Sequence, residues 1–428
     1  MNIDCIEAWE VLDSRVEPTV RVRVDANGTV GQFTVPAGAS TGQFEAVEKR
    51  DGGIRYSGRG VQDAIRNIDE VIAPEIQGMD VTAQARIDQT LLDLDGTENL
   101  SKLGANAVLG VSAAVAHTAA NTTGEPLHQY LSDNETVSLP ILWCQLISGG
   151  LHARGGLEIQ DISVIPMKAP SFSESVEYST RLYHMARERV IERGSMPLVG
   201  DEGGFGMKFD SVDRAFEFTV EVIEHTGFSP GRESVALALD VAASHFYREG
   251  QYKLDSMGQT FTSDQFVDEI VRWIDTYPII SLEDPLAEDD WDGWNQLTDR
   301  VGDQVQLVGD DLLVTNEIRL DRAIGEQSAN AILVKPNQTG TVSSTRSVVS
   351  KAQRNGLNPV ISARSGETAD TTIADMAVAW DTGQLKLGSF RGTERSAKIN
   401  RLLYFEREYG YEFQRGIDRF RPFLEEKS

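Results

Sequence analysis

The chain has few cysteines and no long hydrophobic stretch. Its two cysteines, Cys5 and Cys144, are too few for a disulfide framework, so a reducing cytoplasm is the expected compartment. No stretch approaches the roughly 18 uninterrupted apolar residues of a membrane span. The first residues, MNIDCIEAWEVLDSR, contain neither a basic region nor an apolar one, so we expect no signal peptide.

Positive charge is also in deficit, with 40 Lys and Arg against 66 Asp and Glu and a formal net charge of −26. This balance argues against nucleic acid or an anionic membrane as the main partner. It does not exclude a small anionic substrate, because a local group of cations or a bound divalent cation can lie inside an acidic molecule. The composition therefore predicts a soluble α/β protein.

The pattern of the first third predicts a small α+β domain, which we place at residues 1–135. Residues 1–35 alternate apolar and polar side chains around a turn signal at Ala26-Asn27-Gly28, as in an antiparallel hairpin or meander. From about residue 59 to 131 the pattern becomes helical, rich in alanine, with a glycine stop at Gly124.

Residues 138–428 follow a different pattern, in which short apolar runs recur between longer helical stretches. Repeated strand-plus-helix units predict a parallel sheet, most economically a closed β/α barrel; an open doubly wound sheet is the alternative. The runs are LEIQDISVIP, MPLVGDEGG, VALALD, YPIISLEDP, VQLVGDD, AILVK, PVISARS and QLKLGS. The last six end at Asp240, Glu283, Asp310, Lys335, Arg364 and Lys386, which a barrel would gather at one mouth.

Three of these strand ends are acidic: Asp240, Glu283 and Asp310. Three carboxylates meeting at a barrel mouth would repel each other unless a hard cation lay between them. Oxygen ligands without Cys or His favour Mg²⁺ over zinc. The alternative is that each acid only caps the helix that follows it.

Two lysines also close strands, Lys335 and Lys386. A lysine held near a metal and another cation can have a depressed pKa and act as a base, although both could instead be structural partners of the carboxylates. Arg364 and Ser365 add a forked donor and a hydroxyl that suit a phosphate or carboxylate.

Glu202, in the glycine-rich LVGDEGGFG, completes the group, unless this segment is only an unliganded turn. A metal that holds the substrate carboxylate, with a base on one side of the substrate and an acid on the other, is the arrangement that β-elimination of water from a hydroxy acid requires. The loop VPAGASTGQFEA (35–46), with Ser40, has the composition of a mobile lid.

Ordered motifs along almost the entire chain resemble the enolase (phosphopyruvate hydratase) family. In the first part they are DSR (13–15), GASTG (38–42), LDGTEN (94–99) and LGANAVLGVSAAVA (103–116). In the second part they are VGDEGGF (199–205), SLEDPLAEDDW (281–291), LVGDDLLVTN (307–316), NQTGT (337–341) and RSGET (364–368). The resemblance implies an enolase-type barrel with an N-terminal capping domain, two Mg²⁺ ions and a homodimer or dimer-based assembly.

The resemblance also implies roles for individual residues. Asp240, Glu283 and Asp310 would hold the first Mg²⁺, and Ser40 would help to bind a second one with the substrate. Lys335 would be the base and Glu202 the general acid. Asp161 would be a further catalytic residue. The phosphate would meet Arg364 and Ser365, with His152 nearby, and the carboxylate would meet Lys386. The substrate would also contact Gln160, Ser40 and Ala363.

Several positions depart from the family pattern. The histidine expected before Arg364 is Ala363, and the Gln-Glu pair is Gln160-Asp161, shorter by one methylene. The remaining departures are Phe44 for a histidine in the lid, Val16 and Glu17 for glycine and asparagine, His245 for a glutamate, and Pro336 after the lysine base.

These departures spare the metal ligands, the base and the anion-binding arginine, which suggests a working enzyme with a reshaped pocket. The hypothesis is a Mg²⁺-dependent hydro-lyase that eliminates water from a 2-phosphoglycerate-like acid. Its substrate would be modified at the phosphorus end, like the carboxyphosphonate analogue dehydrated by carboxyphosphonoenolpyruvate synthase in phosphonate and phosphinate natural-product biosynthesis. The alternatives are an ordinary glycolytic enolase and a non-catalytic, enolase-like binding protein.

Overall fold

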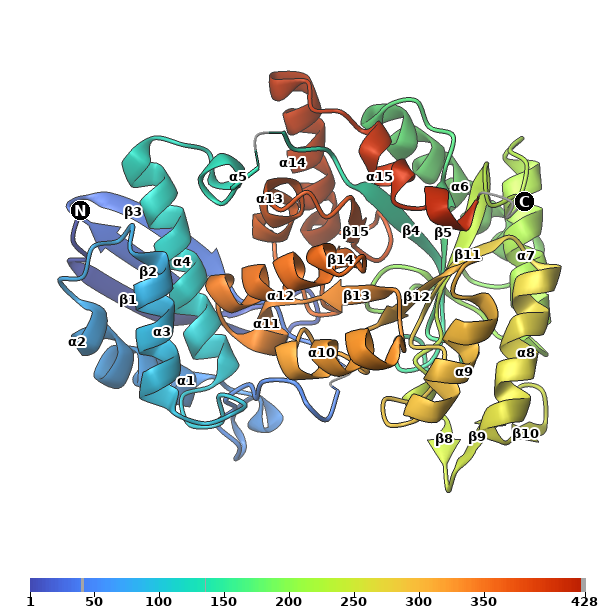
Figure 1. Cartoon of the computed structure of the whole chain (residues 1–428), viewed down its shortest axis with the longest axis horizontal. Coiled ribbons are helices and arrows are strands. Elements are labelled where there is room, and N and C mark those ends of the chain that lie inside the picture. The colour runs from blue at the N-terminus through green and yellow to red at the C-terminus, as the bar shows by residue number, and fades with distance from the viewer. Residues whose placement is uncertain (40–41, 135, 425–428) are drawn as a thin grey trace.

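The computed structural model describes residues 1–39, 42–134 and 136–424. Its first part is a three-stranded antiparallel meander of β1 (Cys5–Leu12), β2 (Pro18–Ala26) and β3 (Thr29–Thr34), as predicted. Helical segments follow, on the left in Figure 1. They are η1 (Arg55–Gly58), α1 (Gln62–Asn67), η2 (Ile68–Ile72), α2 (Ala73–Ile76), α3 (Gln84–Asp95), α4 (Ala105–Thr123) and α5 (Leu127–Tyr130).

Helix α4 is the central element of this first part. It packs on β2 and β3 and also contacts α3, α11 and α12, so nearly all of its residues are buried. Burial on all sides explains its alanine-rich composition, because small side chains allow close approach on every face. Gly124 ends the helix in the left-handed conformation, φ 76°, as the sequence predicted.

The second part is a closed barrel of eight strands. They are β4 (Ile141–Ser148), β5 (Asp161–Pro166), β7 (Val235–Asp240), β11 (Ile279–Glu283), β12 (Gln306–Gly309), β13 (Ala331–Val334), β14 (Asn358–Ser362) and β15 (Gln384–Lys386). Pairing of β15 with β4 closes the circle, which confirms the barrel and excludes the open doubly wound sheet. The two-residue β6 (Phe205–Gly206) pairs with β4 outside the circle.

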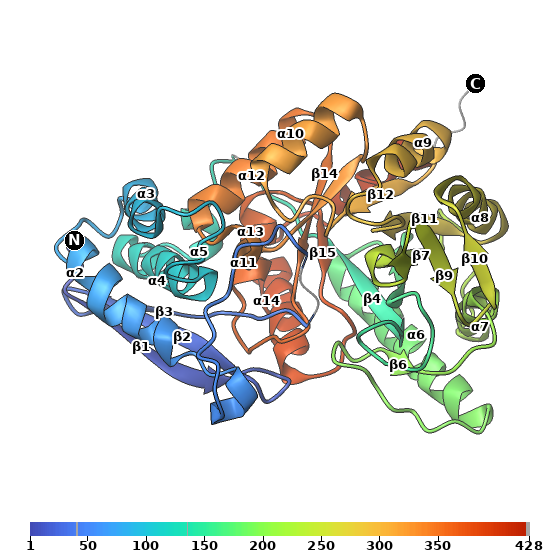
Figure 2. The same cartoon turned by 90° about the horizontal axis from the view of Figure 1, so that it is seen from below.

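Helices surround the barrel, as Figure 2 shows from below. They are α6 (Phe172–Glu192), α7 (Val212–His225), α8 (Ser263–Thr276), α9 (Trp291–Val301), α10 (Glu317–Glu326), α11 (Pro336–Thr339), α12 (Val342–Arg354), α13 (Thr372–Ala379), α14 (Thr393–Tyr409), α15 (Gln414–Asp418) and η4 (Arg421–Phe423). Segment η3 (Ala243–His245) leads into the small sheet of β8 (Tyr247–Arg248), β9 (Gln251–Leu254) and β10 (Gln259–Phe261). None of the helices described is long and apolar enough to cross a membrane.

Two of the predicted strand units differ from the structure. Strand β5 is antiparallel to both neighbours, because residues 149–160 join it to β4 without the helix that a parallel crossover needs. The run MPLVGDEGG forms no barrel strand and has only an isolated bridge between Val199 and Phe205. Its apolar residues Met196 and Leu198 are exposed, so they do not pack in the barrel core as a strand would.

Packing of α4 on the sheet gives a test of the fold. A Cβ at Gly110 would lie 2.7 Å from Cγ2 of Val22, closer than packed atoms come. Gly110→Ala should therefore destabilise the protein by about 1–3 kcal/mol, despite the higher helix propensity of alanine. Urea unfolding measures the change.

The matched control is Gly325→Ala in α10, where a Cβ has no neighbour within 4 Å. Here propensity acts alone, and the change should leave the protein equally stable or slightly more stable. Equal behaviour of the two variants would contradict the close packing of α4.

Candidate functional site

The strand-end residues predicted from the sequence meet at one rim of the barrel. Asp240, Glu283 and Lys386 are the last residues of β7, β11 and β15, and Asp310 and Lys335 directly follow β12 and β13. These strands are parallel, so their carboxyl ends share one rim. Because β5 runs the other way, its first residue, Asp161, joins this rim opposite Asp240.

The acids at the rim are paired with lysines. Nζ of Lys386 lies 2.9 Å from Oδ2 of Asp240 and 2.6 Å from Oε2 of Glu283, so one ammonium bridges two carboxylates. Nζ of Lys335 forms an ion pair with Oδ2 of Asp310. The side chains of Asp240, Glu283, Asp310 and Lys386 are buried, and that of Lys335 is 11% exposed.

These pairings shift the pKa values of the groups involved. Although burial opposes ionisation, Lys386 lowers the pKa of Asp240 to about 2. Burial and the charge of Asp240 raise the pKa of Glu283 well above its ordinary value. Burial favours a neutral Lys335, but Asp310 outweighs it and raises the lysine pKa. This direction is opposite to the depressed pKa expected for a base, because the carboxylate of Asp310 stabilises the ammonium.

A second acidic group lies behind Asp310. Carboxylate oxygens of Asp284, Asp310 and Asp311 all come within 4.8 Å of one another. Asp284 accepts hydrogen bonds from the backbone N–H groups of Asp310, at 3.0 Å, and Asp311, at 2.7 Å. Asp284 therefore fixes the turn that directs Asp310 into the rim. The predicted set Asp240, Glu283 and Asp310 is not drawn together within that distance in the described part of the chain.

The rim nevertheless has the donor chemistry that Mg²⁺ prefers. Asp240, Glu283 and Asp310 provide only oxygen ligands, and the charges of Asp240 and Asp310 both act on buried Glu283. The bridging ammonium of Lys386 shows that the Asp240–Glu283 pair accommodates a cation. Oε1 of Gln160 is buried without a hydrogen-bond partner, while its Nε2 donates to Oδ2 of Asp240 at 3.1 Å.

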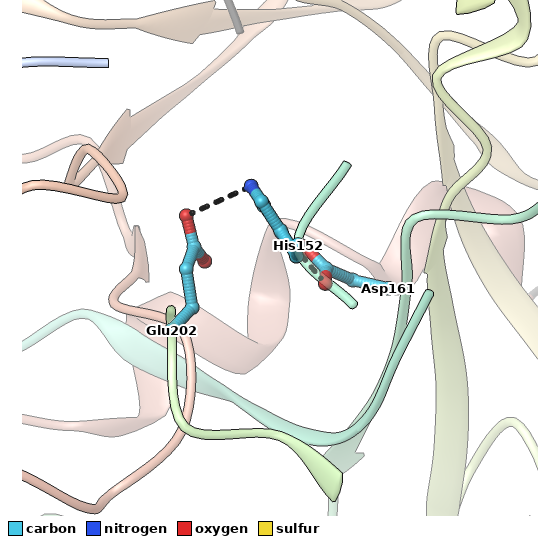
Figure 3. A group of neighbouring side chains, drawn as sticks. All are labelled: His152, Asp161 and Glu202. Carbon is cyan, nitrogen blue, oxygen red and sulfur yellow. Dashed lines mark hydrogen bonds and ion pairs between the residues drawn. The ribbon is translucent and has the colours of Figure 1, made fainter. Parts of the chain in front are cut away.

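His152 links two acids on the other side of the rim (Figure 3). Its Nδ1 is 3.1 Å from Oδ1 of Asp161, and its Nε2 is 3.6 Å from Oε1 of Glu202. Burial alone would lower the pKa of His152, but the charges of Asp161 and Glu202 raise it to about 9. The contacts of His152 in this structure are thus with the predicted acids Asp161 and Glu202.

Asp161 and Glu202 have different environments. Burial raises the pKa of Asp161 to about 6 against the opposing charge of His152. Burial also disfavours ionised Glu202, but the charges of His152 and Arg395 lower its pKa below the ordinary value. Gln145 donates to Oδ1 of Asp161, while Oδ2 is buried and has no hydrogen-bond partner in the part of the chain that the structure describes. The two acids therefore differ in how readily they carry a proton at neutral pH.

Arg364 and Ser365 lie after β14, next to the segment predicted to be a lid. Nη1 of Arg364 donates to Oε2 of Glu45 at 2.9 Å and to Oδ1 of Asn337 at 3.2 Å. Oγ of Ser365 accepts a hydrogen bond from the N–H of Ala39 at 2.7 Å. A Cβ at Gly38 would lie 1.9 Å from Nη2 of Arg364, so only glycine lets the backbone approach this closely.

Ala363 is buried, and its backbone adjoins the backbones of two predicted binding residues, Arg364 and Lys386. It directly precedes Arg364, and its backbone N–H donates to the carbonyl of Lys386 at 2.9 Å. The side chain is a single methyl group that offers no hydrogen bond or charge. The position is therefore part of the rim by its backbone but adds no polar group to it.

The other departures from the family pattern differ in their structural effect. Val16 has φ 64°, a left-handed conformation that is strained for a β-branched residue and favours glycine. The half-exposed ring of Phe44 packs 4.1 Å from the guanidinium of Arg319. Burial lowers the pKa of His245, whose Nδ1 has no partner. Pro336 starts α11, a position where proline is favourable. Glu17 pairs with Arg59 at 2.9 Å.

One predicted residue, Ser40, lies outside the described residues, and others in the site were missed from the sequence. Glu45 and Asn337 bind Arg364, and Gln338 donates to Oδ1 of Asp310 at 2.9 Å. All three belong to stretches singled out above, the lid and the NQTGT motif, which could have identified them. Nothing in the local pattern around Gln145 pointed to a contact with Asp161.

Comparison with known protein families covers both parts of the chain. Residues 3–131 match the family described as enolase, N-terminal domain. Residues 136–420 match the family described as enolase, C-terminal TIM barrel domain. The second match alone includes well over half of the chain and every described strand-end residue of the rim. The chain therefore belongs to the enolase family.

Proposed function

We propose that the protein is a Mg²⁺-dependent hydro-lyase that eliminates water from a 2-phosphoglycerate-like acid modified at its phosphorus end. Membership of the enolase family supports a lyase acting on a small phosphorylated acid. The observation that carries the finer proposal is Ala363, a methyl group beside an intact Arg364–Ser365 pair and an intact set of rim acids and lysines.

In this proposal Arg364 and Ser365 bind the phosphorus end of the substrate. The guanidinium now binds the carboxylate of Glu45, an anion supplied by the protein itself, which shows that this place accommodates negative charge. Arg15 is a further cation nearby, with Nη1 3.4 Å from Oγ of Ser365. A phosphate or phosphonate group would take over or share the donors that Glu45 occupies.

The carboxylate end of the substrate would lie between the two lysines. Lys386 would bind the carboxylate, and Lys335 would take the proton from the adjacent carbon once its pairing with Asp310 is weakened. The chemistry that Mg²⁺ supplies when bound by Asp240, Glu283 and Asp310 is neutralisation of the substrate carboxylate, which acidifies the neighbouring C–H.

The departing hydroxyl would face His152, Asp161 and Glu202. Elimination breaks the C–H bond at Lys335 and the C–O bond at the next carbon, and a proton delivered to the leaving oxygen makes it water. Glu202 is assigned as the general acid. Because the charge of His152 lowers its pKa, Glu202 would have to receive the proton that it delivers from the protonated His152 that it faces. The shorter Asp161 keeps its free Oδ2 inside the same group.

A missing imidazole at position 363 changes what this pocket can recognise. A methyl group leaves more room beside Arg364 and removes a possible cation. A substrate whose phosphorus carries a carboxyl group, the carboxyphosphonate analogue of 2-phosphoglycerate, would use that room. The family substrate itself would lose a contact that a histidine provides.

Steady-state assays with Mg²⁺ compare the two substrates directly. The carboxyphosphonate analogue should turn over with the higher kcat/KM. A kcat/KM for 2-phosphoglycerate of about 10⁴ M⁻¹s⁻¹ or more would mean an ordinary enolase and would contradict the modified substrate. No turnover of either compound would favour a binding protein.

The assignment of Lys335 as the base predicts that Lys335→Ala lowers kcat by a factor of about 10²–10⁴ or more while the far-UV circular dichroism is unchanged. Lys351→Ala is the matched control, because Lys351 forms surface ion pairs with Glu317 and Asp321 on the outer helices. Its activity should equal that of the unmodified protein. Near-normal rates for Lys335→Ala would remove this residue from the role of base.

Restoring the imidazole tests the role of position 363. Ala363→His should raise kcat/KM for 2-phosphoglycerate by about tenfold, the worth of one regained polar contact, and lower it for the carboxyphosphonate analogue. The ratio of the two kcat/KM values is the measured quantity. An unchanged ratio would count against a pocket reshaped at this residue.

A further inference from the structure

Arg395, in the first turn of α14, is fully buried directly behind the anion-binding loop of Arg364 and Ser365. Its Nη1 donates to the carbonyl oxygen of Arg364 at 2.9 Å, and its Nη2 donates to that of Ser365 at 3.0 Å. The two ends of one planar guanidinium thus bind two consecutive carbonyls. This fork fixes the backbone direction from which the Arg364 and Ser365 side chains project.

The partners of Arg395 are unusual for a buried cation. Within the described residues its hydrogen bonds go to carbonyl oxygens, it forms no ion pair, and its Nε has no partner. A buried charge without a counter-ion is costly, since carbonyl dipoles replace only part of its hydration. A dianionic ligand bound on the other side of the loop would provide the missing negative charge. The charge of Arg395 also acts on Glu202 at the rim, since it contributes to the lowered pKa of that carboxyl group.

Lys398, one turn further along α14, holds the same loop at a second point. Its buried Nζ lies 2.8 Å from Oε2 of Glu367, and Oε1 of Glu367 accepts the backbone N–H of Arg364 at 3.1 Å. Lys398 also donates to the carbonyl of Thr368 at 3.0 Å. The loop is therefore held by α14 over its whole length. Lys398 has a carboxylate partner, whereas Arg395 has none among residues 1–39, 42–134 and 136–424.

We propose that Arg395 is a positioning residue for anion binding, which orients Arg364 and Ser365 toward the phosphorus group of the substrate and adds its own unbalanced charge to that subsite. The proposal rests on the proposed function only in that this loop binds the phosphorus end. It does not depend on which of the two substrates the enzyme uses.

Inorganic phosphate is the probe, with its dissociation constant measured by calorimetry on the full chain in the presence of Mg²⁺. Arg395→Met should weaken phosphate binding by about tenfold or more, since both the fork and the charge are lost. Arg395→Lys keeps the charge, but the lysine ammonium cannot span two carbonyls. Its loss of phosphate affinity should therefore be intermediate. With the substrate that turns over, KM should rise while kcat changes much less.

Arg407→Met is the matched control, because Arg407 is exposed in the last turn of the same helix and should leave phosphate binding unchanged. Circular dichroism identifies any variant that fails to fold, and Arg395→Lys then decides the question. Unmodified protein that does not bind phosphate would overturn the loop as an anion site, and Arg395 with it. If the unmodified protein binds phosphate and a folded Arg395 variant binds it equally well, the positioning role of Arg395 is overturned, but the loop remains an anion site.

Discussion

The bridging of Asp240 and Glu283 by Lys386 is the interaction on which the site depends. Two carboxylates buried this close cannot both stay ionised unless a cation lies between them, and the raised pKa of Glu283 reflects that demand. Each of these groups comes from a different strand, so the barrel must be closed for the charges to meet.

The first part of the chain completes this rim from outside the barrel. The turn at Asp13–Glu17 contacts the anion-binding loop, where the N–H of Ser14 donates to the carbonyl of Glu367 at 2.8 Å. Ala37 and Gly366 form an antiparallel bridge, and Glu45 reaches Arg364. On the opposite side the same loop is held by α14. The proposed anion site is thus formed by two parts of the chain, and its loop is held from both sides.

The barrel and its strand-end residues were predictable, because β7 and β11–β15 are continuous apolar runs that each lead to one charged group. The reversal of β5 was not, since its apolar run reads the same in either direction and only the short link from β4 decides it. Arg395 was also hidden: an arginine in a polar helical stretch resembles a solvent-exposed residue, and only the packing of α14 on the loop buries it. Pairwise contacts such as Glu45 with Arg364 join residues far apart in the chain, which no local pattern encodes.

Glu45 has a consequence for selectivity. Because its carboxylate is tethered to the same chain as Arg364, it competes for the guanidinium at a high effective concentration that no free ligand can dilute. A ligand with a single negative charge would only replace the carboxylate of Glu45 by a group of equal charge, and would gain little binding free energy. A doubly charged phosphorus group would gain a further unit of attraction, so under the proposed function Glu45 would make the site select ligands by their charge.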